Sequence, residues 1–296
     1  MIETYPLYGG KVKLMYDSVK HKYFEGGQEV DGVTTALGKI DKSGQLVWWA
    51  VNDVCLPFIF GNETGNVKPG KPKFPGMIHA GKAYDEVFLM NLREEASTKH
   101  RTVTKTAAGI GTMIHEWCEK WIKADINKRR KAGTPIIHAG YNDYPPMPVN
   151  PQMINGAKAF LEFVKKHHVI FQESENKIFS RLYRYAGTQD FEAIIDGELC
   201  IGDLKTSNAI YTTYRYQVSA YQQARFEETG NDYKARWILR VGKEATVDSE
   251  GNPAVEFEAV RLDKSEHDED FKTFLASLQI LRREKLLSPK SWGNGY

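Results

Sequence analysis

Residues 187–207 read GTQDFEAIIDGELCIGDLKTS, with an Asp196-Gly197 pair between two apolar, β-branched runs. Asp-Gly is a preferred pair for a two-residue type I′ turn, because both central residues of that turn need a positive φ. The two runs therefore predict a β-hairpin with Ile195 opposite Glu198. Counting back along this register places Asp190 opposite Asp203.

The opposed carboxylates of Asp190 and Asp203 indicate a cation site, because like charges directly opposite one another destabilise a sheet. A hard divalent cation binds carboxylate oxygens and would remove this repulsion. Lys205 lies two residues after Asp203, so its side chain is expected on the same face of the strand. Two carboxylates and a lysine at one strand end suggest metal-assisted hydrolysis of a phosphodiester.

The composition is that of an ordinary globular protein, with 296 residues, 41% hydrophobic residues and 26% charged residues. This length suits one large domain or two modest ones. No apolar run approaches the length of a membrane span, and the first residues resemble neither a signal peptide nor a transit peptide. The net charge of +2 says little, although the basic cluster at 120–131 is compatible with a polyanionic partner.

Three cysteines, Cys55, Cys118 and Cys200, are odd in number and far apart in the sequence. This spacing argues against a disulfide framework and against a zinc or iron–sulfur site. Each cysteine is interpreted as a small buried hydrophobic residue. A reducing, cytoplasmic location is expected.

The periodicity predicts a helical N-terminal half followed by a compact core in the order β-β-β-α-β. An N-terminal hairpin is expected over 11–30. The expected helices lie at 33–49 in two pieces, 79–131 with a break around 97–106, 151–168, 211–228 and 265–286. The expected core strands lie at 173–184, 190–196, 198–206, 234–241 and 255–262. Long loops are expected at 61–76 and 133–151.

Two helical segments carry further candidate site residues, each of which also has a plain packing interpretation. His115 and Glu119 are four residues apart and share a helix face that points inward. An inward histidine alone is more often a core residue, but an acidic pair awaiting another ligand favours a functional role. Gln217 and Tyr221 lie on one stripe of the helix that follows Lys205, where core packing is the alternative.

In their order along the chain, these residues resemble the PD-(D/E)XK nuclease superfamily, and within it the RecB-like exonuclease branch. The resemblance rests on Gly-Thr-x-x-His at 111–115, a strand glutamate (Glu175) followed by Gly-x-x-Asp at 187–190, Asp-x-Lys-Thr-Ser at 203–207, and Gln-x-x-x-Tyr at 217–221. The spacing from Glu175 to Asp203 is also similar to that of phage exonucleases and mitochondrial genome maintenance exonucleases. A weaker similarity to the start of such enzymes lies at Asp31-Gly-Val-Thr-Thr-Ala-Leu37. The cysteine quartet of the iron–sulfur members is missing.

The resemblance implies a role for each matched residue. His115, Asp190 and Asp203 would bind Mg²⁺ or Mn²⁺, together with the carbonyl of Leu204. Lys205 would orient the nucleophile or stabilise developing charge, and Glu175 would organise the site or contact a second metal. The substrate strand would be held by Gln217, Tyr221, Thr206 and Ser207, with Glu119 as a supporting residue.

The sequence thus predicts an α/β protein with a PD-(D/E)XK restriction-endonuclease-like core, a mixed central sheet flanked by helices, and a helical N-terminal elaboration. The elaboration is assigned to 1–106 and the nuclease core to 107–296. The predicted function is a metal-dependent DNA exonuclease acting on a free DNA end, in phage or bacterial recombination, repair or replication. The alternatives are a structure- or site-specific endonuclease and a catalytically inactive nucleic-acid-binding protein. DNA is the expected partner, a single-strand-annealing or single-strand-binding protein is a further candidate, and no membrane partner is expected.

Overall fold

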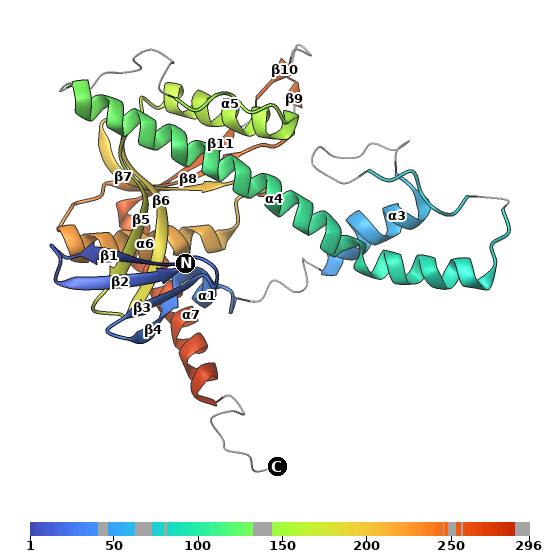
Figure 1. Cartoon of the computed structure of the whole chain (residues 1–296), viewed down its shortest axis with the longest axis horizontal. Helices are drawn as coiled ribbons and strands as arrows, with labels where there is room; N and C mark the ends of the chain where they lie inside the picture. The colour runs from blue at the N-terminus through green and yellow to red at the C-terminus, as the bar shows by residue number, and fades with distance from the viewer. Residues whose placement is uncertain are drawn as a thin grey trace.

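A computed structural model describes residues 1–40, 47–62, 73–79, 82–132, 144–244, 246–247, 253–255 and 257–287 (Figure 1). Its strands are β1 (Ile2–Leu7), β2 (Val12–Asp17), β3 (Lys22–Glu25), β4 (Gln28–Gly32), β5 (Ile170–Ser180), β6 (Tyr185–Ile195), β7 (Glu198–Lys205), β8 (Ala235–Val241), β9 (Thr246–Val247), β10 (Pro253–Ala254) and β11 (Phe257–Asp263). Its helices are α1 (Val33–Leu37), the π-helical η1 (Ala50–Cys55), α3 (Leu56–Phe60), α4 (Glu86–Ala132), α5 (Pro151–Lys166), α6 (Thr212–Thr229), the 3₁₀ turn η3 (Lys264–Glu266) and α7 (His267–Leu287).

A nine-stranded mixed sheet forms the centre of the described structure. Strands β1 to β4 form an antiparallel meander, which joins the core through a short parallel pairing of β4 with β6. Helices α4 and α5 pack on one face of the core sheet, and α1, α6 and α7 pack on the other (Figure 1). This arrangement confirms the predicted α/β class with a mixed sheet between helices.

The central hairpin has the predicted turn and register. Asp196 and Gly197 have φ values of 50° and 87°, as a type I′ turn requires, and Ile195 pairs with Glu198. The ladder continues to the pair Phe191–Gly202, so the next positions on the two strands are Asp190 and Asp203. β6 begins at Tyr185, five residues before the predicted start, and β5 begins at Ile170 rather than at 173.

Helix α4 corrects the prediction of a break around 97–106, because it runs without interruption over Glu86–Ala132. The hydroxyl groups of Ser97, Thr98 and Thr104 donate hydrogen bonds to carbonyls three or four residues earlier, so these polar residues are satisfied inside the helix. Figure 1 shows α4 reaching from the core out to a small lobe with α3. α4 also crosses the expected boundary at 106–107, and the division into two domains stays a prediction.

The helices predicted at 151–168, 211–228 and 265–286 are present as α5, α6 and α7, whereas the helix predicted from residue 33 ends at Leu37 and η1 and α3 were not predicted. Asn150 accepts backbone hydrogen bonds at the start of α5, and Gly230, with φ 72°, ends α6. The meander contains a strand, β1, that the sequence analysis did not predict. Parts of the expected segments at 33–49, 61–76 and 133–151 lie outside the described residues. Within the described part of the chain, no helix is both long and apolar enough to cross a membrane.

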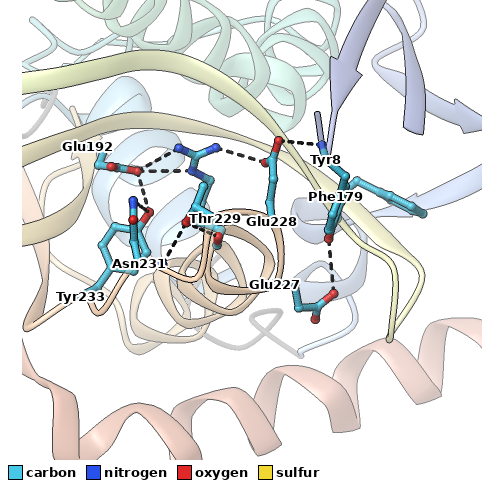
Figure 2. Close-up of polar contacts among 9 residues, drawn as sticks. Tyr8, Phe179, Glu192, Glu227, Glu228, Thr229, Asn231 and Tyr233 are labelled. Atoms are coloured by element: carbon cyan, nitrogen blue, oxygen red, sulfur yellow. Dashed lines mark hydrogen bonds and ion pairs between the residues drawn. The ribbon is translucent and has the colours of Figure 1, made fainter. Parts of the chain in front are cut away.

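A polar network fixes α6 against β6 and the meander (Figure 2). Arg225 on α6 forms ion pairs with Glu192 of β6 at 3.2 Å and with Glu228 at 3.1 Å. The buried Glu192 also accepts a 2.7 Å hydrogen bond from the Tyr233 hydroxyl, and Glu228 accepts one from the Tyr8 N–H at 3.1 Å. This network holds α6 in a fixed position along the strand that carries Asp190.

Gly202 lies under the ring of Phe191, where a Cβ atom would come within 2.0 Å of two ring carbons. We therefore expect Gly202→Ala to destabilise the protein by about 1–3 kcal/mol through overpacking. Gly109→Ala in α4 is the matched control, because no atom of a described residue lies within 4 Å of its added methyl group. Alanine there should be neutral or stabilising, since glycine costs about 0.5–1 kcal/mol in a helix. Chemical denaturation of both variants checks this, and equal stabilities would contradict the described packing.

Candidate metal-dependent active site

The candidate site lies in a gap of the central sheet. β4 pairs with β6 only at Tyr185 and Ala186, and β7 pairs with β6 only from Phe191 onward. Residues 187–190 of β6 therefore lie between the carboxyl ends of β4 and β7. Crevices at the carboxyl ends of strands are the usual ligand sites of open α/β sheets.

Asp203 and Lys205 lie on one face of β7, as predicted. Asp203 is 1% exposed, and its Oδ2 lies 2.6 Å from the Lys205 ammonium. Within the part of the chain that the structure describes, neither carboxylate oxygen has a hydrogen bond of acceptable geometry, so the ion pair compensates the burial of this charge incompletely. Burial raises the pKa of Asp203 to about 6, with Lys205 opposing the shift and Asp190 adding to it.

The side chain of Asp190 accepts a backbone hydrogen bond at the point where the β6–β7 ladder ends. Its Oδ2 accepts a 2.7 Å hydrogen bond from the Leu204 N–H. Burial raises the pKa of Asp190, against the lowering effects of Lys205 and of this hydrogen bond. Asp190, Asp203 and Lys205 thus form one electrostatic cluster, which the hairpin register predicted.

His115 reaches the same cluster from α4. Its Nδ1 lies 3.8 Å from Asp190 Oδ2, and its side chain is partly exposed. Burial and the nearby Lys205 lower the pKa of His115 to about 4, with Asp203 opposing, so the imidazole is neutral at neutral pH. Gly111 allows this approach of α4, because a Cβ there would lie 2.5 Å from Thr206 Oγ1.

Glu175 lies on β5 between the ladder pairs Ser174–Phe191 and Asn176–Gln189, so its position faces Asp190. Its φ of 54° is rare for a residue other than glycine and marks local strain of the kind found at functional sites. Burial raises the pKa of Glu175 to about 8, and Asp190 and Glu119 add to the shift. Glu119 itself forms an ion pair with Lys123.

The donor set fits a hard divalent cation. Within the described residues, no group of three or more His, Cys, Asp or Glu side chains is arranged so that it could hold a metal ion without side-chain movement. However, the lowered pKa keeps His115 neutral, Asp190 lies beside it, and both Asp203 oxygens are buried with no well-oriented hydrogen bond from a described residue. A cation bound by these three residues would supply the missing compensation. The proposed use of the Leu204 carbonyl stays a prediction.

The four residues predicted to hold the substrate lie in two places, two of them buried on α6 and two directly after β7. Gln217 and Tyr221 are buried, and the Gln217 amide donates a 2.7 Å hydrogen bond to the Tyr221 hydroxyl. Thr206 packs against Gly111, and Ser207 accepts a 3.1 Å hydrogen bond from Tyr214. Their contact with a substrate strand remains a prediction.

Tyr214 is a site residue whose role the sequence analysis missed. The Lys205 ammonium lies 4.8 Å from the centre of the Tyr214 ring, within the range of a cation–π interaction. The ring is held by its hydrogen bond to Ser207, which in turn donates to the Ala209 carbonyl at 2.8 Å. Tyr214 therefore contacts Lys205 in addition to Asp203. The only sequence signal was its place on the same helical stripe as Gln217 and Tyr221.

The raised pKa of Glu175 predicts how stability changes with pH in the metal-free protein. A carboxyl group with a raised folded-state pKa stabilises the fold at low pH and loses that contribution as pH rises through the folded value. The lowered pKa values of His115 and His267 act in the opposite direction, but only below about pH 6.5. Between pH 6.5 and 8 we therefore expect a loss on the order of 1–2 kcal/mol, chiefly from Glu175.

Urea denaturation in EDTA at several pH values measures this loss. Glu175→Gln should flatten the dependence between pH 6.5 and 8. An unchanged slope in that variant would show that another group titrates.

His115→Ala tests the metal role of the histidine. If His115 is a ligand, the Mn²⁺ concentration for half-maximal activity should rise about 10–100-fold or more, with little change in melting temperature. His267 is a matched control, because burial and Arg236 lower its pKa to about 4 as well, while its ring stacks on Phe271 at 5.8 Å. His267→Ala should lower the melting temperature and leave the Mn²⁺ dependence unaltered. The same pattern in His115→Ala would assign His115 to core packing.

Comparisons with known proteins give only distant similarity. Neither a protein-family model nor a curated protein matches the sequence. A candidate exonuclease from Eubacterium rectale is 10% identical with a TM-score of 0.36, over 63% of this chain and 75% of that one. The alkaline exonuclease LHK-Exo from Laribacter hongkongensis, also solved in complex with dAMP, is 16% identical with a TM-score of 0.26, over 55% of this chain and 81% of that one. At these scores the function must be argued from the site itself.

Proposed function

We propose that this protein is a divalent-metal-dependent nuclease that hydrolyses phosphodiester bonds from a free DNA end. The observation that carries the proposal is the buried Asp203 carboxylate, which among the described residues has the Lys205 ammonium at 2.6 Å but no well-oriented hydrogen bond, in a gap also reached by Asp190 and His115. This charge arrangement is unfavourable without a cation. It is suited to a site that uses one.

His115, Asp190 and Asp203 would hold Mg²⁺ or Mn²⁺, with the Leu204 carbonyl as a further ligand. When bound, the metal lowers the pKa of a water molecule and neutralises charge on the phosphate. Lys205 would orient that nucleophile or stabilise the phosphorane charge from its fixed position between Asp203 and Tyr214. Glu175, with its raised pKa, would hold a proton or contact a second metal.

Assignment to the RecB-like exonuclease branch of the PD-(D/E)XK superfamily is supported by the four motifs, which the fold brings together. Gly111 packs on Thr206, and Gly187 packs on Tyr221, so motifs distant in sequence are in direct contact. We further propose a role in phage or bacterial DNA recombination, repair or replication. A single-strand-annealing or single-strand-binding protein would be a fitting partner in that role.

A structure- or site-specific endonuclease is the second candidate, because the same chemistry serves both activities. End-labelled linear DNA and covalently closed circles, each incubated with Mg²⁺, Mn²⁺ or EDTA, separate the two. We expect progressive shortening of linear DNA, survival of circles, and no cleavage in EDTA. Nicking of circles would support the endonuclease, and binding without any cleavage would support an inactive nucleic-acid-binding protein.

A further inference from the structure

A cavity of about 240 Å³ opens beside the candidate active site, in the same gap of the sheet. Its walls come from β2 and the β2–β3 turn (Tyr16, His21), from the start of α1 (Thr34, Thr35), from β6 (Thr188) and from α6 (Tyr221). The α1 wall belongs to the segment 31–37 noted in the sequence, to which the catalytic proposal gives no role. The carboxylates occupy the β7 side of the gap, and this cavity occupies the β4 side.

The cavity adjoins the carboxylate cluster directly. Thr188, which lines the cavity together with Tyr221, is two residues from Asp190 on the same strand. Asp203 and Asp190 add to the raised pKa of Tyr221, and Glu175 does the same for Tyr16. Lys177, which pairs with Thr188 in the ladder, lies 5.0 Å from the centre of the Tyr16 ring. A chain molecule with a phosphate at the carboxylates would therefore place its neighbouring unit at the cavity.

The lining has the chemistry of a base-binding site rather than of a phosphate site. Its residues carry three threonine hydroxyls, three tyrosine rings and one imidazole, with no carboxylate and no ammonium or guanidinium group. Two of the tyrosine hydroxyls are held by hydrogen bonds. The Tyr16 hydroxyl lies 2.9 Å from His21 Nδ1, and the Tyr23 hydroxyl lies 2.9 Å from the Thr188 hydroxyl. Tyr16 and Tyr23 also stack on each other with centroids 4.8 Å apart. Neutral polar groups among aromatic rings suit the edges and faces of an unpaired base.

Resting on the proposed nuclease function, we propose that this cavity receives the base of the nucleotide next to the scissile phosphate. At about 240 Å³ the cavity is smaller than the roughly 300–1,000 Å³ of pockets that enclose drug-sized ligands, a size that suits one base rather than a base pair. The substrate strand is therefore single-stranded at the active site. A duplex end must be unpaired there before cleavage.

Fluorescence anisotropy in EDTA tests this proposal without any need for turnover. A short labelled single strand should bind more tightly than a blunt duplex of the same length. Tyr16→Ala should weaken single-strand binding about 5–150-fold, the range typical of aromatic residues that stack on bases. Thr34→Phe, which fills the cavity from an exposed position, should weaken it similarly, and duplex binding should change little. Tyr84→Ala is the matched control, because Tyr84 is also half-buried and stacks on Phe88 at 4.8 Å, but in the distant lobe.

An abasic scan along the single strand identifies the base that enters the cavity. One abasic position should reduce wild-type binding, and Tyr16→Ala should cause no further loss on that oligonucleotide. The proposal would be overturned if the effects of Tyr16→Ala and of an abasic site were additive at every position of the oligonucleotide. Binding equal to that of the wild type in both Tyr16→Ala and Thr34→Phe would overturn it as well. If Tyr16→Ala binds single strands as the wild type does and still cleaves DNA, the base-binding role of the cavity is rejected and the nuclease function is not. Base-dependent binding without any Mg²⁺-dependent cleavage would reject the nuclease function alone.

Discussion

Asp203→Asn and Asp190→Asn should each remove nearly all cleavage, by at least about 10²–10³-fold. Each substitution keeps the shape of the side chain but removes the negative charge that attracts the cation. Cleavage of end-labelled linear DNA in Mg²⁺ measures the loss. The fold should persist, and the metal-free melting temperature of Asp190→Asn should be equal to or higher than that of the wild type, because Asp190 and Asp203 then no longer repel. Asp203→Asn also removes the ion-pair partner of Lys205, so its melting temperature should not rise.

Asp196→Asn provides a control with the same chemical change at the other end of the same hairpin. Asp196 is exposed and has a φ of 50°, which asparagine also tolerates, and Asn-Gly forms the same turn. This variant should retain wild-type cleavage. Appreciable turnover by Asp203→Asn, or by the wild type in excess EDTA, would contradict the assignment.

Lys205→Met should separate the electrostatic role of Lys205 from its catalytic role. Without Lys205, the buried Asp203 loses its ion-pair partner, and breaking such a pair typically costs about 3–5 kcal/mol. Protonation of Asp203 limits this cost at low pH, so the loss should grow as pH rises. Mn²⁺ should restore much of the stability, because the cation supplies the positive charge that Asp203 lacks. It should not restore cleavage.

Denaturation of Lys205→Met with EDTA and with Mn²⁺, alongside the cleavage assay, gives both results. Lys234→Met is the control, because Lys234 forms an exposed ion pair with Asp232 at 2.5 Å and should have no measurable effect on either. Full activity in Lys205→Met would remove Lys205 from the mechanism. Stability that Mn²⁺ does not restore would argue against metal binding by Asp203.

The sequence predicts those parts of the site that depend on local register. The Asp196-Gly197 turn fixes the pairing, and the alternation along β7 places Asp203 and Lys205 together. Gly111-Thr-x-x-His115 could be placed because a helix presents residues four apart on one face. In each case, short-range geometry determines where the functional atoms lie.

Features that depend on long-range packing were missed or wrong. α4 continues through 97–106 although serine and threonine clusters usually indicate a break, and Leu92 and Ala96 just before this stretch are buried in one cluster with Phe58 of α3. The positive φ of Glu175 and the cation–π contact of Tyr214 have no local sequence signature. The cavity beside the site combines β2, α1, β6 and α6, which are up to two hundred residues apart.

Anomalous diffraction from a crystal grown with Mn²⁺ tests the central claim most directly. We predict a manganese peak within about 2.0–2.5 Å of carboxylate oxygens of both Asp190 and Asp203, with an imidazole nitrogen of His115 as a further ligand. Lys205 should then lie against Tyr214. The absence of a peak between these carboxylates at saturating Mn²⁺, with Asp203 still paired only with Lys205, would contradict the account.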